Sequence, residues 1–200
     1  MGARLPVRHR AARKGGDTVR GLTPSQTVGP FFDFALPYDG GERLVSPGDP
    51  DAVRIVGAVI DGDGEPVDDA LIEIWQANRH GRYHHPEDTR EELPLEDGFS
   101  GFGRCPTDAE GRFEFVTVKP GAADGQAPHI SVCVLARGLL RHLFTRIYFP
   151  DEPEANAADP LLTSIEDERV RRTLIARRLD GVLAFDIHLQ GERQTAFLDV

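Results

Sequence analysis

A series of strand-like segments between residues 112 and 149 limits most strongly the folds that this chain can adopt. Residues 112–121 read R-F-E-F-V-T-V-K-P-G, residues 128–138 read P-H-I-S-V-C-V-L-A-R-G, and residues 145–149 read T-R-I-Y-F. β-branched and aromatic residues fill each segment, and Pro or Gly closes the first two. An unpaired polar group costs about 1–3 kcal/mol when buried. A partner or a chemical role is therefore expected for the polar residues within these runs: Lys119, His129, Arg137 and Arg146.

The rest of the chain repeats the same pattern of short apolar runs separated by turn signals. The 21 Gly and 15 Pro favour many short elements over long helices. Apolar stripes predict one helix within residues 161–179, ended by Asp180 and Gly181. Residues 184–189 and 195–200 are predicted to form a closing hairpin. The fold class predicted is mainly β: a β-sandwich core with Greek-key connections, long irregular loops and one helix in the C-terminal half. The strands predicted before that helix are 53–60, 70–75, 113–118, 129–136 and 145–149.

Charge and composition together divide the chain into three predicted parts. Residues 1–20 hold six basic residues and one acidic residue, a net charge of +5, whereas the whole chain carries −10. We predict that this basic arm is disordered. Two prolines and a glycine lie within residues 23–32, so residues 21–52 suit an extended segment that docks on a partner. Residues 53–200 form the β-sandwich domain, whose acidic balance argues against binding to nucleic acid.

Cysteine usage and the absence of long apolar runs indicate a cytoplasmic protein. Cys105 and Cys133 make no disulfide framework, and Cys133 is expected to be a buried, inert thiol. The basic arm lacks the apolar core of a secretory signal. No stretch is apolar for long enough to span a membrane.

A long irregular stretch at residues 76–103 is the strongest indication of a functional loop. Loops of this length inside a compact domain are usually functional or disordered, and this one is rich in His, Tyr, Arg and Phe. No nucleophile elbow, P-loop, dinucleotide fingerprint or C-x-x-C pair is present. Imidazole and phenolate are suitable ligands for ferric iron. The candidate ligands of this kind are His80, His84, His85, His129 and Tyr83. The simpler explanation is that the loop histidines are solvated and that His129 is a hydrogen-bonded histidine of the core.

Taken in order, seven short motifs resemble those of the intradiol ring-cleavage dioxygenases over about residues 23–200. Each motif alone is weak, but the ordered set is specific. The motifs are W-Q-A-N at 75–78, G-R-Y at 81–83, G-F-G-R at 101–104, T-V-K-P-G at 117–121, P-H-I-S at 128–131, R-I-Y-F at 146–149 and F-D-I at 185–187.

The resemblance implies a β-sandwich that holds Fe(III) with two tyrosines and two histidines and cleaves a catechol. Tyr83 matches the first tyrosine position and His129 matches one histidine position. The second tyrosine is expected after K-P-G, where this chain has alanines at 122–123, and Ser131 replaces the other histidine. An arginine expected just upstream is replaced by Gln126. The resemblance therefore implies that this chain alone has no catalytic residue and binds no metal, and that Tyr83 and His129 are relict ligand positions.

Within the family, the chain resembles the α-type subunit of heteromeric members. Such a subunit pairs with a homologous β subunit that holds the Fe(III), and αβ units assemble into a hetero-oligomer. The shared site would cleave protocatechuate with O2 to 3-carboxy-cis,cis-muconate, a step in bacterial aromatic catabolism. Thr27, Gly29, Pro30 and Phe31 would form a wall of this pocket. Arg137 would point toward it, where a guanidinium suits either the substrate carboxylate or an acid of the partner.

Two other functions are compatible with the residues. The chain could be a self-sufficient Fe(III) catechol dioxygenase with an altered ligand set of Tyr83, His129 and either His84 or His85. It could also be a non-enzymatic β-sandwich binding module, since a fold alone does not establish a function.

Overall fold

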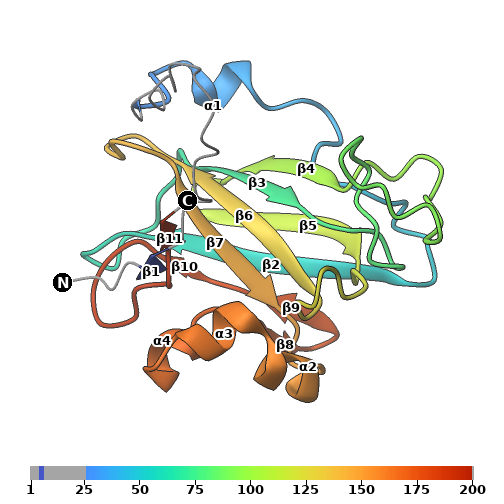
Figure 1. Cartoon of the computed structure of the whole chain (residues 1–200). Helices are drawn as coiled ribbons and strands as arrows, with labels where there is room; N and C mark the ends of the chain where they lie inside the picture. Colours follow the sequence, from blue (N-terminus) through green and yellow to red (C-terminus); the bar gives the residue numbers. More distant parts are fainter. Residues whose placement is uncertain (1–4, 7–25, 200) are drawn as a thin grey trace, which may run out of the picture.

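Two β-sheets face each other in the computed structural model, which describes residues 5–6 and 26–199 (Figure 1). The first sheet has the strand order β1-β11-β7-β6-β3-β4. The second has the order β10-β2-β9-β8, and β5 pairs with β2. The strands are β1 (Leu5–Pro6), β2 (Ala52–Ile60), β3 (Leu71–Trp75), β4 (Phe102–Pro106), β5 (Arg112–Val118), β6 (His129–Leu135), β7 (Leu143–Tyr148), β8 (Arg177–Leu179), β9 (Val182–Ala184), β10 (Ile187–His188) and β11 (Leu198–Asp199).

The core lies between the two sheets and is built by alternation along the central strands. Ile55 on β2 pairs with Phe115 on β5 in the second sheet, and both are fully buried. Ile72 on β3 pairs with Val134 on β6 in the first sheet, and both are fully buried as well. Because side chains alternate across a strand, every second residue of β6 enters this core while the others point away from it. The predicted mainly-β sandwich is confirmed.

A short strap, residues 41–44, joins the edges of the two sheets. The Gly41 carbonyl accepts a hydrogen bond from the Arg104 amide of β4 at 2.8 Å. The Glu42 carbonyl accepts one from the Val116 amide of β5 at 2.9 Å, and the Leu44 amide donates to the Val116 carbonyl at 2.8 Å. The strap therefore covers the free side of β4 and of β5 at once.

The single predicted helix within residues 161–179 is wrong. Two short helices, α3 (Pro160–Ser164) and α4 (Glu168–Arg172), overlap this region, and a third, α2 (Pro153–Ala158), precedes it. Asp159 ends α2 in an extended conformation and its side chain caps α3, and Asp167 caps α4 in the same way. Pro160 comes directly after Asp159, and proline is favoured at the first position of a helix, so α3 starts there as a new helix. The last residues of the predicted helix instead form β8.

The predicted closing hairpin of residues 184–189 and 195–200 is also wrong, and the predicted strands do not include β4. β9 and β10 both pair in parallel with β2, whereas β11 pairs with β7 in the other sheet. The loop predicted at 76–103 ends at residue 101, because β4 begins at Phe102. Gly103 and Pro106 depress the strand signal of that segment, and at Gly103 the Leu44 side chain packs so closely that an added Cβ would lie 2.5 Å from Leu44 Cδ1.

The division of the chain into arm, docking segment and domain remains a prediction. Apart from Leu5–Pro6 in β1, the basic arm at 1–20 lies outside the described residues, as do residues 21–25. The part of the docking segment that is described contains one short helix, α1 (Phe32–Ala35), on the opposite side of the sandwich from α2–α4 (Figure 1).

Candidate functional site

Register brings five side chains together on the face of the first sheet that points away from the core. Trp75 on β3 lies opposite Ser131 on β6, and Ser131 lies opposite Arg146 on β7. In the next row, His129 on β6 lies opposite Tyr148 on β7. Residues opposite each other in antiparallel strands share a face, as do residues two apart along one strand. The five residues therefore form two adjacent rows.

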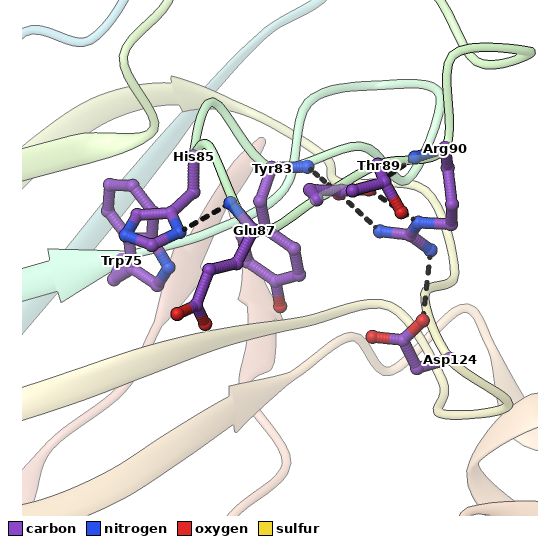
Figure 2. Close-up of a pocket in the computed structure, with 8 residues that line it drawn as sticks. Trp75, Tyr83, His85, Glu87, Thr89, Arg90 and Asp124 are labelled. Atoms are coloured by element: carbon purple, nitrogen blue, oxygen red, sulfur yellow. Dashed lines mark hydrogen bonds and ion pairs between the residues drawn. The ribbon is translucent and has the colours of Figure 1, made fainter.

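The loop between β3 and β4 adds Tyr83 to this face. The Tyr83 ring stacks on the Trp75 ring, with centroids 6.0 Å apart and planes 15° from parallel. Both rings line a cavity of about 620 Å³, whose lining residues Figure 2 shows in close-up. The other lining residues are His85, Glu87, Asp88, Thr89, Arg90 and Asp124.

Close backbone contact fixes the loop against the turn after β5. Gly81 has a φ of +82°, and a Cβ at this position would lie 2.2 Å from the Ala122 carbonyl oxygen. Only glycine fits both conditions. The Asn78 side-chain oxygen accepts hydrogen bonds from the amides of His80 and Arg82 at 2.9 and 3.0 Å, which holds the turn that presents Tyr83.

Arg90 ties the loop together on the far side of the cavity (Figure 2). Its guanidinium donates to both carboxylate oxygens of Asp88, at 2.8 and 2.5 Å, and to the Gly81 carbonyl at 3.0 Å. It also lies 3.2 Å from the Asp124 carboxylate. The hydrogen bonds from Arg90 hold the pKa of Asp88 well below its usual range. Asp88 and Arg90 are therefore both charged at neutral pH.

A buried carboxylate joins the sheet to α3. Asp159 is fully buried, and its Oδ1 accepts hydrogen bonds from the amides of Leu161 and Leu162 and from the Tyr148 hydroxyl, at 2.9 to 3.0 Å. Its Oδ2 accepts the Ala127 amide at 2.9 Å. The carboxylate is thus paired with four donors, as a buried charge requires.

His129 is a neutral base within this network. Its Nδ1 lies 2.8 Å from the Ala127 carbonyl oxygen, which can only accept, so Nδ1 carries the proton and Nε2 is left as an acceptor. Burial, together with the charge of Arg146, lowers the pKa of His129 from 6.5 to about 4. These contacts are those expected of a hydrogen-bonded histidine in the core, which is the simpler interpretation of His129.

The residues present do not fit ferric iron. Burial raises the pKa of Tyr83, which disfavours the phenolate that would bind the metal. The alanines after K-P-G offer no donor, and Ser131 offers only a hydroxyl in place of an imidazole. Within residues 5–6 and 26–199, no group of three or more His, Cys, Asp or Glu side chains is placed to hold a metal ion.

The loop histidines do not make up for the missing ligands. His84 Nδ1 lies 3.2 Å from the Phe99 carbonyl oxygen, and His85 Nδ1 accepts the Glu87 amide at 3.2 Å. His85 lines the cavity beside Trp75 and Tyr83. These contacts use one nitrogen of each ring, and no group of three or more His, Cys, Asp or Glu side chains that includes either histidine is placed to hold a metal ion in the described part of the chain.

The predicted pocket and interface residues lie away from this cavity. Arg137 follows the end of β6 that is opposite to His129, is exposed, and pairs with the Asp69 carboxylate. Thr27, Pro30 and Phe31 are exposed, and Gly29 has a φ of +82°. Over the described part of the chain, no hydrogen bond or ion pair links Arg137 to residues 26–31. If these residues serve a catalytic site, that site is not the Trp75–Tyr83 cavity.

Sequence reasoning missed most of the residues that line the cavity. Among the lining residues, Trp75 stands in one of the motifs, and Tyr83 and His85 are candidate ligands in the sequence. Nothing in the sequence pointed to Arg90 or Asp124, because their contact depends on how the 76–101 loop folds back on the turn after β5.

Two cysteines lie outside the cavity. Both are free, and Cys133 is half-buried rather than fully buried. Burial raises the pKa of the Cys133 thiol to about 12, which agrees with the predicted inert thiol.

No helix among the described residues is both long and apolar enough to cross a membrane.

Comparisons with known proteins agree with the fold and the motifs. A family profile described as Dioxygenase matches residues 28–191. The chain is 45% identical over 197 residues to a protocatechuate 3,4-dioxygenase alpha chain of Burkholderia cepacia, covering 89% of this chain and 97% of that one. It is 40% identical to the beta chain of the same organism, covering 80% of this chain and 74% of that one. The dioxygenase domain of a carbohydrate-binding fusion protein from Streptomyces sp. SirexAA-E superimposes with a TM-score of 0.55 at 27% identity, covering 90% of this chain and 98% of that one.

The family profile matches most of the chain, and one relative is 45% identical to it along almost the full length of that relative. The chain belongs to the intradiol dioxygenase family, whose members are oxidoreductases that use Fe(III).

Proposed function

We propose that this chain is the alpha subunit of a heteromeric protocatechuate 3,4-dioxygenase. In this proposal it completes a substrate site whose Fe(III) is held by a homologous beta subunit. The observation that carries the proposal is a mismatch. The chain is similar along its length to an alpha chain, yet its Tyr83–His129 face lacks the donors that iron needs. The similarity to a beta chain supports a partner built on the same fold.

The reaction would be the cleavage of the ring bond between the two hydroxyl-bearing carbons of protocatechuate. Both oxygen atoms of O2 enter the product, 3-carboxy-cis,cis-muconate. The partner's iron, when bound, would supply the activation of catechol and O2. This chain would contribute shape, exclusion of water and fixed charge, which are large terms in catalysis.

Thr27, Gly29, Pro30 and Phe31 are proposed to form one wall of the shared pocket. The exposure of Thr27, Pro30 and Phe31 supports this role, because a segment with Phe31 66% exposed in the isolated chain is available to a partner. Phe31 carries no hydroxyl, so its contribution to the pocket would be apolar.

Arg137 is proposed to face the same shared site. Its side chain is 70% exposed, and the Asp69 carboxylate is the one partner that it has among the described residues, so it can turn toward another anion. The carboxylate of protocatechuate and an acidic side chain of the partner are both suitable, because a guanidinium binds carboxylates in a bidentate manner.

Co-expression with a beta-type chain tests the proposal. Each chain alone and the mixture would be assayed for O2 uptake with protocatechuate and for the visible absorption of tyrosinate bound to iron. We expect colour and activity only when the beta chain is present. Stoichiometric iron and ring cleavage by this chain alone would instead identify a self-sufficient enzyme. Failure of the two chains to associate would favour the non-enzymatic binding module.

An Arg137→Gln variant separates the two roles of this residue within the complex. A rise in KM for protocatechuate with unchanged assembly indicates contact with substrate, whereas weaker assembly indicates contact with the partner. Arg169→Gln is the matched control, since Arg169 is an exposed arginine paired with a neighbouring aspartate.

We also propose that the protein works in the cytoplasm, which its two free cysteines support.

A further inference from the structure

A second cavity, the Arg193 cavity, lies between the end of α4, the strands β8 to β10 and the loop that leads to β11. Its volume is about 290 Å³, and none of its described lining residues also lines the Trp75–Tyr83 cavity. The Trp75–Tyr83 cavity is lined by three carboxylates and one arginine, whereas the Arg193 cavity is rich in cationic and hydroxyl groups. Its polar lining residues are Arg172, Arg177, Arg193, His188, Asp186, Thr173 and Thr195. The whole chain carries a charge of −10, so three arginines around one cavity stand out against an acidic molecule.

Two of the three arginines form exposed ion pairs. The Arg172 guanidinium lies 2.5 Å from the carboxylate of Glu168, one turn earlier on α4, and the Arg177 guanidinium lies 3.0 Å from the carboxylate of Asp186. The two arginine side chains are 74% and 71% exposed. Exposed pairs of this kind contribute little to stability, because water screens both charges. Each guanidinium can therefore leave its carboxylate for a ligand at little cost.

The third arginine, Arg193, has no acidic partner of its own. Among the ion pairs and side-chain hydrogen bonds of residues 5–6 and 26–199, none involves Arg193. Its charge nevertheless acts on the cavity, because it adds to the larger effect of burial in lowering the pKa of His188. The imidazole is therefore neutral at neutral pH, and one of its nitrogens carries a proton that it can donate. The cavity thus holds a positive charge that no described side chain neutralises through an ion pair.

A buried hydroxyl adds a further donor. Thr195 is 1% exposed, its Oγ1 accepts the His188 amide at 3.0 Å, and no described residue accepts the proton of this hydroxyl. The neighbouring Thr173 differs, because its hydroxyl donates to the Val170 carbonyl at 2.7 Å and accepts the Ala196 amide at 2.9 Å. Buried polar groups normally use their hydrogen-bonding capacity. The Thr195 hydroxyl therefore has a proton left for a group bound in the cavity.

We propose that the Arg193 cavity binds a small anion with at least two negative charges. Guanidinium groups bind carboxylates and phosphates through parallel N–H donors, and such charged hydrogen bonds are strong. The lining has three positive charges against the one negative charge of Asp186, an excess that a divalent anion balances. A water molecule takes up about 30 Å³ of the liquid, so about 290 Å³ is room for an ion of several heavy atoms. A phosphate group and a polycarboxylate both have this chemistry.

Calorimetric titration of the full-length chain at neutral pH tests the proposal, with inorganic phosphate in one series and citrate in the other. Sodium chloride keeps the ionic strength constant, so that general screening does not differ between samples. The variants are Arg193→Gln and Arg172→Gln. Arg169→Gln is the matched control, because Arg169 is also an exposed arginine of α4 paired with a nearby acid but does not line the cavity.

We expect one equivalent of phosphate or citrate to bind. The dissociation constant should rise about tenfold or more in Arg193→Gln and in Arg172→Gln, as for the loss of a charged hydrogen bond, and should stay within about twofold in Arg169→Gln. Tighter binding of phosphate would identify a phosphate group as the ligand, and tighter binding of citrate a polycarboxylate. Absence of binding in both series would overturn the proposal. Equal weakening by the control would overturn it too, because the attraction would then be general.

Nuclear magnetic resonance of the His188 imidazole locates the bound anion in the unaltered chain, and His188→Gln assigns its signals. We expect these signals to shift during the titration with the dissociation constant that calorimetry gives. Binding that leaves them unchanged would place the anion elsewhere and would contradict the proposal even if an arginine variant failed to fold. The experiment uses neither a partner nor iron, so its outcome is independent of the proposed subunit function.

Discussion

Protonation of His129 would place a second cation beside Arg146 on a buried face. The pKa of His129 in the folded chain is about 4, below the ordinary value of 6.5 that it regains on unfolding. Between these values the unfolded chain binds the proton more readily than the folded chain. The contribution of neutral His129 to stability is therefore complete above pH 6.5 and is lost as the pH falls toward 4.

We expect His129→Gln to flatten this pH dependence, since the amide can still donate to the Ala127 carbonyl but does not titrate. The difference between 6.5 and about 4 corresponds to about 3 kcal/mol of unfolding free energy. Urea unfolding at several pH values across this range measures it. The exposed His142→Gln variant should behave like the wild type. An unchanged pH slope in His129→Gln would contradict the assignment.

Asp159 and Asp167 cap neighbouring helices but differ in burial. Asp159 is fully buried and accepts four hydrogen bonds, whereas Asp167 is exposed. Asp159→Ala would leave three amides and the Tyr148 hydroxyl unpaired, so we expect a loss of about 3–5 kcal/mol in stability. Asp167→Ala should cost about 1 kcal/mol, as for an ordinary cap. Chemical denaturation of the two variants makes the comparison, and equal losses would contradict it.

At the scale of the element, β2 depends on a glycine. A Cβ at Gly57 would lie 1.9 Å from the Phe185 carbonyl oxygen and 2.7 Å from Phe113 Cζ. The carbonyl belongs to the backbone that joins β9 to β10 and cannot swing aside. We expect Gly57→Ala to destabilise the chain by about 3 kcal/mol or more. Calorimetry against Gly48→Ala tests this, because a Cβ at Gly48 would meet only Ser46 Oγ, at 3.7 Å.

The long strands of the sandwich were predictable, and the short elements were not. β3 and β6 bury alternate side chains over most of their length, which leaves a period-two pattern in the sequence, and β2, β5 and β7 are long apolar runs rich in β-branched and aromatic residues. β8 to β11 are two or three residues long, too short for any period. β8 and β9 pair with each other, but the pairings of β9 and β10 with β2 and of β11 with β7 join segments far apart in the chain. The helical stripe at 161–179 failed because Asp159 and Asp167 each start a new helix within or beside it.

The candidate site was partly predictable for a similar reason. The motifs located Tyr83 and His129, and the structure brings them to the same face. Strand register placed Arg146 opposite Ser131, and register between distant segments cannot be read from one strand alone. The pairing of Arg90 with Asp124 depends on two loops that approach through Gly81, which no local pattern encodes.

At the scale of the whole molecule, two aromatic side chains are exposed beside each other at α1. Phe31 and Phe34 are 66% and 70% exposed, and their rings meet edge to face at 5.7 Å. Exposed aromatic pairs of this kind commonly mark interfaces.

We expect the double variant Phe31→Ser, Phe34→Ser to weaken association with the proposed beta subunit about tenfold or more, equivalent to at least about 1.4 kcal/mol. The melting temperature of the isolated chain should stay unchanged. Sedimentation of the mixed chains measures the affinity. Leu179→Ser is the control, because Leu179 is also 55% exposed but lies on β8. Equal weakening by the control would remove the case for an interface at α1.

The strap at residues 41–44 has a consequence for the shape of the free molecule. β4 ends the first sheet and β5 borders the second, and the strap covers the free side of both. Uncovered strand edges pair readily with the edges of other chains. A chain shortened to begin after residue 44 would bare two such edges together. We therefore expect it to aggregate through intermolecular strand pairing even where its core remains folded.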